Sequence, residues 1–133
     1  MQQLDCILLI DDDEITNFVN ESLIKDLKVA QEVLVTTGGQ QALDLIKLRW
    51  QQGNRLPNLI LLDMNMPGMN GLEFLESYQQ LEKELQPSVI IVILTSSNNP
   101  ADVAQIERTK RADLLNKPLT ETKIEHVMKK YFA

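Results

Sequence analysis

Residues 59–71 read "LILLDMNMPGMNG", and this stretch decides the fold. Four apolar residues run directly into Asp63, and a loop of methionine, asparagine, proline and glycine follows. A short run of leucine and isoleucine that stops at turn residues is typical of a buried strand. A carboxylate at the end of such a strand is costly to remove from water unless a charged group meets it. The stretch therefore predicts a strand that ends at a polar site around Asp63.

Further apolar runs alternate with helical patterns on both sides of this stretch. Together with residues 59–62, the runs cover residues 6–10, 33–36, 89–94 and 112–115. Three of the five are nearly continuous in Leu, Ile and Val, as expected of parallel strands that are covered on both faces. Five strand–helix units in 133 residues predict an α/β fold, a three-layer sandwich around a parallel sheet. Nothing indicates a second domain, so residues 1–133 are expected to form a single domain.

The helical patterns carry their own end signals. Asn70 and Glu73 have the spacing of a reciprocal helix cap, and Asn99 followed by Pro100 resembles a cap with a first-turn proline. Thr120 is expected to cap the last helix. One further helix is predicted from apolar residues that follow the 3.6-residue period: Ile15, Phe18, Val19, Leu23 and Leu27.

Composition and charge exclude several classes of function. The chain is 44% hydrophobic and 24% charged, as in a globular protein rather than a disordered one. Its net charge of −6 argues against a surface built to bind nucleic acid. No apolar run approaches the roughly 20 residues that span a bilayer, and the first residues lack the pattern of a signal peptide. With Cys6 as its single cysteine, the protein is expected in the cytoplasm, without membrane insertion.

Polar side chains follow the apolar runs at one predicted edge of the sheet. Asp11 and Asp12 follow the first run, Asp63 the third, Thr95 the fourth and Lys117 the fifth. In open α/β sheets, ligands bind outside these carboxyl ends of the strands. Carboxylates held a few ångströms apart repel one another and need a cation at neutral pH. Because no His or Cys accompanies the acids, Mg²⁺ is the expected metal, and Lys117 supplies a second positive charge.

Such a site suits phosphoryl transfer. Mg²⁺ and Lys117 would neutralise an incoming phosphoryl group, while Thr95 would donate a hydrogen bond to one of its oxygens. Asp63 would then act as the nucleophile and form an acyl phosphate.

Four motifs at these strand ends resemble one family. "ILLIDDDE", "LILLDMNMPGMNG", "IVILTSS" and "LLNKPL" are similar, in order and over essentially the whole chain, to the receiver domain of bacterial two-component response regulators. The resemblance implies a flavodoxin-like sheet of order 2-1-3-4-5 with five helices. It also implies a phosphorylation-dependent signalling switch rather than an enzyme. The phosphoryl group would come from a sensor histidine kinase or a His-phosphotransfer protein, and the switch would regulate an unknown downstream protein.

The same resemblance implies roles around the phosphorylated residue. Asp63 would be the phosphoacceptor. Asp12 would bind Mg²⁺ directly, with Asp11 acting through water or as a second acid, and the backbone carbonyl of Asn65 would be a further ligand.

The resemblance also implies how the signal leaves the site. Thr95 would sense the phosphoryl group, Lys117 would bind it, and a cis peptide bond is expected before Pro118. Receivers usually carry Tyr or Phe three residues before the lysine, where the ring turns inward on activation, but this chain has Leu114. Coupling from Thr95 is therefore expected to be weaker or differently built. The contact face would be formed by the fourth helix, fifth strand and fifth helix, with Arg108, Lys110, Arg111 and Lys123.

Two other functions fit part of the pattern. A phosphatase of the haloacid dehalogenase type also uses an aspartyl nucleophile with Mg²⁺, but it carries a second acid two residues later, where this chain has Asn65. A receiver-like interaction module that is never phosphorylated is the other alternative. Leu114 gives it some weight, and the complete set of acids, threonine and lysine argues against it.

Overall fold

The computed structural model describes residues 3–85, 89–96, 99–109 and 111–133. Within these ranges the strands form one sheet, whose members are β1 (Leu4–Ile10), β2 (Ala30–Thr36), β3 (Leu59–Asp63), β4 (Ile90–Thr95) and β5 (Ala112–Asn116). The strand order is β2-β1-β3-β4-β5, and every neighbouring pair is parallel. The expected order of the sheet is confirmed.

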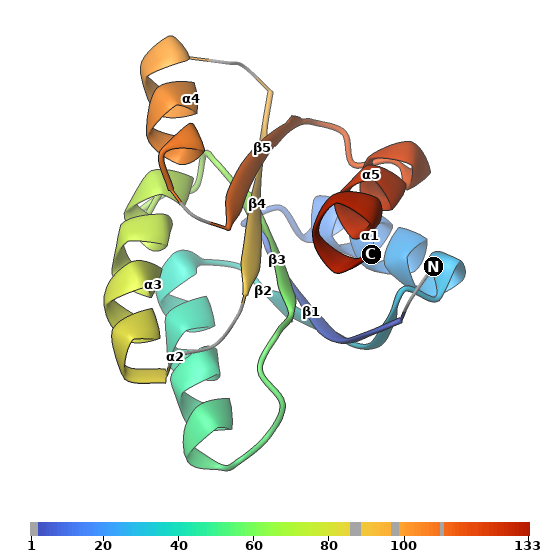
Figure 1. Cartoon of the computed structure of the whole chain (residues 1–133), viewed down its shortest axis with the longest axis horizontal. Coiled ribbons are helices and arrows are strands. Elements are labelled where there is room, and N and C mark those ends of the chain that lie inside the picture. The colour runs from blue at the N-terminus through green and yellow to red at the C-terminus, as the bar shows by residue number, and fades with distance from the viewer. Residues whose placement is uncertain (1–2, 86–88, 97–98, 110) are drawn as a thin grey trace.

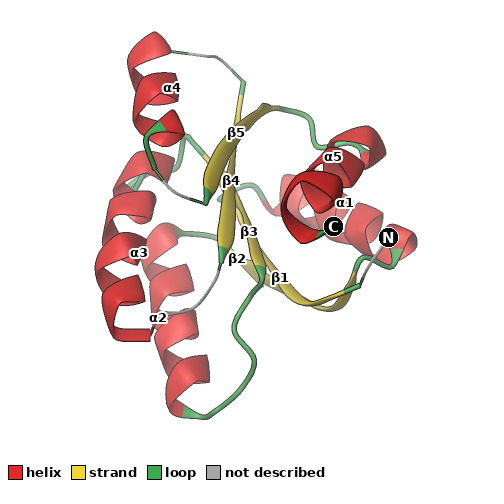
Figure 2. Cartoon of the chain, viewed as in Figure 1, coloured by secondary structure: helices red, strands yellow, loops and turns green. Residues whose placement is uncertain are grey.

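Helices cover both faces of this sheet. They are α1 (Glu14–Leu27), α2 (Gly39–Gln51), α3 (Gly71–Leu85), α4 (Pro100–Glu107) and α5 (Glu121–Phe132). Figure 1 shows α2, α3 and α4 on one face and α1 and α5 on the other. Figure 2 shows the same three layers by type of element, so the predicted sandwich is confirmed. Within the described ranges, no helix has the length and apolar character needed to cross a bilayer.

Two apolar cores hold the sheet in place. Alternate side chains of the central strands point to opposite faces. Leu8 and Ile60 are buried with residues of α2 and α3, whereas Leu9 and Leu61 are buried with residues of α1 and α5. Full burial of one such side chain contributes about 1.5–3 kcal/mol. Since β3 and β4 are buried along their whole lengths, their carboxyl ends are firmly positioned.

The predicted helix caps are confirmed. The Asn70 amide donates to Glu73 Oε1 at 3.1 Å, and the Glu73 amide donates to Asn70 Oδ1 at 2.9 Å. Asn99 and Thr120 each accept a hydrogen bond from a first-turn amide, of α4 and α5 respectively. Asp13 caps α1 in the same way. The third acid after β1 therefore serves the helix.

Helix α1 forms where the apolar period predicts it, but the period does not predict its buried side. Asn17 and Asn20 are only 3% and 8% exposed. The Asn17 side-chain amide donates to the backbone carbonyls of Asp11 at 2.8 Å and Thr36 at 3.4 Å. These bonds turn the polar side of the first turns toward the sheet. Three apolar side chains consequently point outward and are 75%, 69% and 56% exposed: Ile15, Phe18 and Val19.

We call Ile15, Phe18 and Val19 the α1 patch. The later members of the predicted apolar set, Leu23 and Leu27, do pack against the core. Among the apolar residues predicted for α1, the exposed ones thus lie at the start of the helix, close to the acidic strand end.

Candidate functional site

The carboxyl ends of β1 and β3 bring three acids together. Asp63 is the last residue of β3, and Asp11 and Asp12 directly follow β1. Each offers a carboxylate oxygen, and these three oxygens all lie within 4.8 Å of one another. Asp11 and Asp63 are buried, whereas Asp12 is exposed. The cluster therefore has a dry side against the sheet and a side open to a ligand.

Lys117 reaches this cluster from the loop after β5. Its Nζ lies 2.7 Å from Asp63 Oδ1 and 4.0 Å from Asp11 Oδ2. Its backbone amide donates to the Thr95 carbonyl at 2.8 Å, which fixes the loop to β4. The peptide bond between Lys117 and Pro118 is cis, as expected. A charged partner for Asp63, predicted from the costs of burial, is present.

Thr95 and Asn65 lie at the same end of the sheet. Thr95 is the last residue of β4, is 1% exposed and pairs with Asn116 of β5. Asn65 is exposed, and its amide donates to Asp63 Oδ1 at 3.3 Å. The metal contact of the Asn65 carbonyl and the sensing role of Thr95 stay predictions.

The electrostatics of the cluster favour a divalent cation. Burial, and then the neighbouring charge of Asp63, raises the pKa of Asp11, although the Asp13 amide and Lys117 act in the opposite direction. Three carboxylates face one ammonium group, and no His or Cys belongs to the group of acids. An oxygen-only donor set with excess negative charge fits Mg²⁺.

Asp11→Asn is expected to stabilise the metal-free protein by about 0.5–2 kcal/mol at neutral pH, as substitutions at strained functional sites commonly do. A raised pKa means that the folded state binds the proton more tightly than the unfolded chain does. The ionised carboxylate therefore opposes folding once the pH exceeds the folded pKa, and this cost disappears below the unfolded pKa of about 3.9. Urea unfolding in a chelator across this range measures the difference.

The order of stability should reverse when Mg²⁺ is added, because the wild-type site gains more binding free energy than the Asn variant. If Asp11→Asn is less stable than the wild type in chelator at pH 7, the ionised Asp11 carboxylate is stabilised by its protein neighbours without a metal.

Asn17 was missed by sequence reasoning. Its bond to the Asp11 carbonyl ties the start of α1 to the acidic strand end. An asparagine inside an apolar helical pattern was the available signal, because a polar side chain there needs a buried partner. The partners lie at the carboxyl ends of β1 and β2, so the sequence alone could not identify them.

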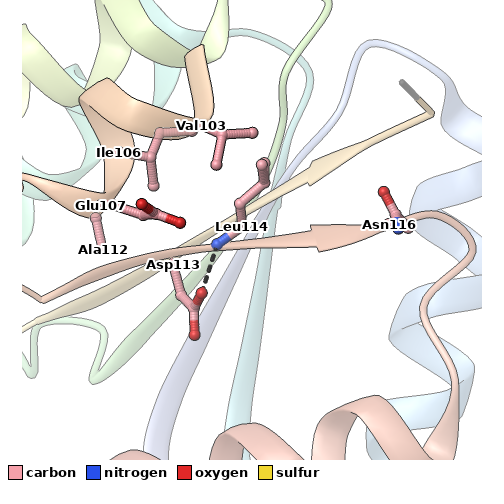
Figure 3. Close-up of a pocket in the computed structure, with 7 residues that line it drawn as sticks. All are labelled: Val103, Ile106, Glu107, Ala112, Asp113, Leu114 and Asn116. Atoms are coloured by element: carbon pink, nitrogen blue, oxygen red, sulfur yellow. Dashed lines mark hydrogen bonds between the residues drawn. The ribbon is translucent and has the colours of Figure 1, made fainter. Parts of the chain in front are cut away.

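A pocket of about 210 Å³ lies between α4 and β5. Figure 3 shows Leu114 directed toward Val103 and Ile106 of α4, while the Asp113 carboxylate lies on the other side of the strand. That carboxylate accepts a hydrogen bond from the Tyr131 hydroxyl at 2.7 Å. Burial raises the pKa of Asp113, but hydrogen bonds led by that from Tyr131 outweigh burial and leave the pKa below its ordinary value. The switch role of Leu114 stays a prediction.

Comparison with known proteins agrees with this geometry. Residues 7–129 match the model of the response regulator receiver domain. A probable C4-dicarboxylate response regulator, DctR of Halalkalibacterium halodurans, is 30% identical over 125 residues, which are 94% of this chain and 50% of the regulator. A crystal structure of a two-component response regulator from Cytophaga hutchinsonii has a TM-score of 0.88 and 32% identity, with 97% of each chain covered.

A further solved structure is the receiver domain of the histidine kinase CKI1 from Arabidopsis thaliana, complexed with Mg²⁺ and BeF₃⁻. It has a TM-score of 0.76 and 25% identity, and covers 94% of this chain and 90% of that one. The chain spans about half the length of DctR, so the match describes only part of that regulator. The family match extends over nearly all of the chain, and the sheet order, helices and acidic strand ends agree with it. The chain therefore belongs to the response regulator receiver domain family.

Proposed function

We propose that this receiver domain is a phosphorylation-dependent signalling switch whose Asp63 carboxylate accepts a phosphoryl group. The donor is a sensor histidine kinase or a His-phosphotransfer protein. The observation that carries the proposal is the 2.7 Å contact of Lys117 Nζ with Asp63 inside a cluster of three carboxylates. In this proposal residues 1–133 form one receiver domain, which acts in the cytoplasm and catalyses nothing beyond its own phosphorylation and dephosphorylation.

The reaction is a transfer between two side chains. A carboxylate oxygen of Asp63 attacks the phosphorus of a phosphohistidine, an O–P bond forms, and the P–N bond breaks with the electron pair returning to the imidazole. Lys117, whose Nζ contacts Asp63, would bind an oxygen of the transferred group. Thr95 donates its hydroxyl hydrogen to a second phosphoryl oxygen. The product is an acyl phosphate on Asp63.

Asp11, Asp12 and Asp63 would hold Mg²⁺, with the Asn65 carbonyl as a further ligand. The metal supplies positive charge that neutralises the phosphoryl oxygens and the crowded carboxylates. The closeness of the three acids supports this site, and the related CKI1 receiver was solved with Mg²⁺ and BeF₃⁻. Intact mass after incubation with acetyl phosphate and Mg²⁺ tests the function, with one added phosphoryl group expected and none in chelator.

Phosphorylation would change the positions of Thr95 and Leu114 and thereby the face formed by α4, β5 and α5. This face would contact the downstream protein. The pocket beside Leu114 gives the side chain room to move against α4. Of the basic residues predicted on this face, Arg111 forms an ion pair with Glu82 of α3 at 2.7 Å. Lys110 lies outside the described residues. No nucleic acid or membrane is involved in this output.

The mass measurement also separates the alternatives. An unchanged mass in the presence of Mg²⁺ would favour the unphosphorylated interaction module. Continuous release of phosphate from simple phosphate esters would favour the phosphatase, although the position two residues after Asp63 is Asn65 rather than an acid.

The α1 patch is suited to receive the protein donor. It follows the acidic strand end directly, and its three side chains are more than half exposed. Any protein that brings a phosphohistidine to Asp63 has to cover this edge of the sheet. Contact with the patch would remove apolar area from water, which contributes about 25 cal/mol per Å².

Phe18→Ser is expected to slow transfer from a phosphorylated histidine kinase at least tenfold, as the loss of an aromatic anchor commonly does at interfaces. Uptake from acetyl phosphate should fall far less, because a small donor needs no protein surface. Initial rates with the two donors give the comparison, and Trp50→Ser, at an exposed position on α2, is the matched control. Equal slowing with both donors would assign Phe18 to the fold instead of to docking.

A further inference from the structure

Lys123 occupies an unusual position in α5. Thr120 caps the helix by accepting from the Lys123 amide at 3.2 Å, so Lys123 is the third helical residue. The dipole disfavours a cation in the first turn, and a threonine cap is commonly matched by Glu or Gln at this position. Lys129 and Lys130 lie in the last turn, where the dipole favours them. The position of Lys123 therefore calls for another explanation.

The contacts of its ammonium group supply one. Lys123 Nζ donates to the Asn116 carbonyl at 2.6 Å and to the Pro118 carbonyl at 2.8 Å. An ammonium has three donors, and its bonds to carbonyl oxygens are charge-assisted and short. The two carbonyls belong to the residues immediately before and after Lys117. Lys123 thus holds the backbone on both sides of the lysine that contacts the phosphoacceptor.

The segment from Asn116 to Leu119 is also held by the pairing of Asn116 with Thr95 and by the burial of Leu119. Asn116 and Pro118 are exposed, so little apolar burial fixes their backbone. On the sheet side, the Lys117 amide donates to the Thr95 carbonyl at 2.8 Å. On the helix side, the described polar contacts to the two flanking carbonyls come from Lys123. The backbone of Lys117 is therefore held between β4 and the first turn of α5.

We propose that Lys123 is a positioning residue, whose ammonium holds the two carbonyls beside Lys117 and so keeps the Lys117 ammonium at Asp63. This rests on the proposed phosphoryl-transfer function. A displacement of about 1 Å in a catalytic arrangement lowers a rate by about 100-fold, and the Thr95 contact limits the displacement here. The effect of Lys123 is exerted through Lys117 alone.

Lys123→Met removes the donors but keeps the length of the side chain. The initial rate of phosphoryl uptake from acetyl phosphate in Mg²⁺ is expected to fall about tenfold, less than the full cost of a misplaced group. Lys123→Arg retains donors and should recover most of the rate. Lys129→Met, at an exposed position on the same helix, is the matched control and should keep the wild-type rate. Mg²⁺ affinity by calorimetry should not fall in any of the three, because the acids belong to other elements.

The double variant Lys123→Met/Lys117→Met distinguishes positioning from a general role in stability. If Lys123 acts through Lys117, the double variant takes up phosphate as slowly as Lys117→Met alone. A further tenfold fall in the double variant, or a parallel loss of Mg²⁺ affinity, would overturn the positioning role. So would a Lys123→Met rate equal to wild type, while the proposed function would stand. A wild-type protein that takes up no phosphoryl group would overturn both.

Discussion

Asp63→Asn is expected to abolish phosphoryl uptake completely. The substitution keeps the shape of the side chain but turns the charged carboxylate into a neutral, weakly nucleophilic amide, so no acyl phosphate can form. Intact mass after incubation with acetyl phosphate and Mg²⁺ should show one phosphoryl adduct in the wild type and none in the variant. The buried position of Asp63, 4% exposed, makes Asn the replacement that disturbs the packing least.

Asp26→Asn is the control for this measurement, because Asp26 is an exposed acid of α1. It should carry the adduct to the same extent as the wild type. An adduct that persists in Asp63→Asn and disappears in another acidic variant would move the phosphoacceptor elsewhere. An adduct in both proteins that survives chelation would indicate non-specific modification by acetyl phosphate that needs no metal site.

Lys117→Met is expected to slow phosphoryl uptake about 100- to 1,000-fold. Rates typically fall by this factor when one preorganised hydrogen-bond donor is removed from a reaction centre. The ammonium group lies 2.7 Å from Asp63 and is the cation that the structure places among the acids. The same substitution should destabilise the metal-free protein, because it leaves buried carboxylates without a positive partner. Added Mg²⁺ should recover much of that stability without restoring the rate.

Two measurements check this prediction together. Uptake rates are compared in saturating Mg²⁺, and urea unfolding is compared with and without the metal. Lys47→Met, at an exposed position on α2, is the control for loss of a charge. A Lys117→Met protein with a normal rate would mean that the lysine only balances the acids.

The sheet and the strand ends were predictable because their signals are local. The runs that end at Asp63 and Thr95 are apolar at almost every position, since β3 and β4 are covered on both faces. The caps at Asn70 and Asn99 depend on residues within one turn, and they too were correctly predicted. Patterns of this kind carry the physical cause of the structure within a few residues.

The buried side of α1 was not predictable in the same way. Apolar period alone places Phe18 toward the core, but the Asn17 amide bonds to carbonyls at the ends of β1 and β2 and rotates the helix face. The contacts of Lys123 likewise join the first turn of a helix to the loop before it. The sequence does show that Lys123 stands where Glu or Gln commonly completes a helix cap. It does not show which carbonyls the ammonium group binds, because these come together only in the folded loop.

The outward orientation of the α1 patch has a consequence for how such proteins diversify. Because Ile15, Phe18 and Val19 are largely outside the core, exchanging them for other residues should change the free energy of unfolding by only about 0.5 kcal/mol. Gene duplicates could therefore acquire separate phosphodonors by changing these three positions, with the sheet and its acids left intact. Asn17, inward on the same helix, does not have that freedom. The outward side of α1 can thus change so that related proteins accept different phosphodonors, while the inward side preserves the fold.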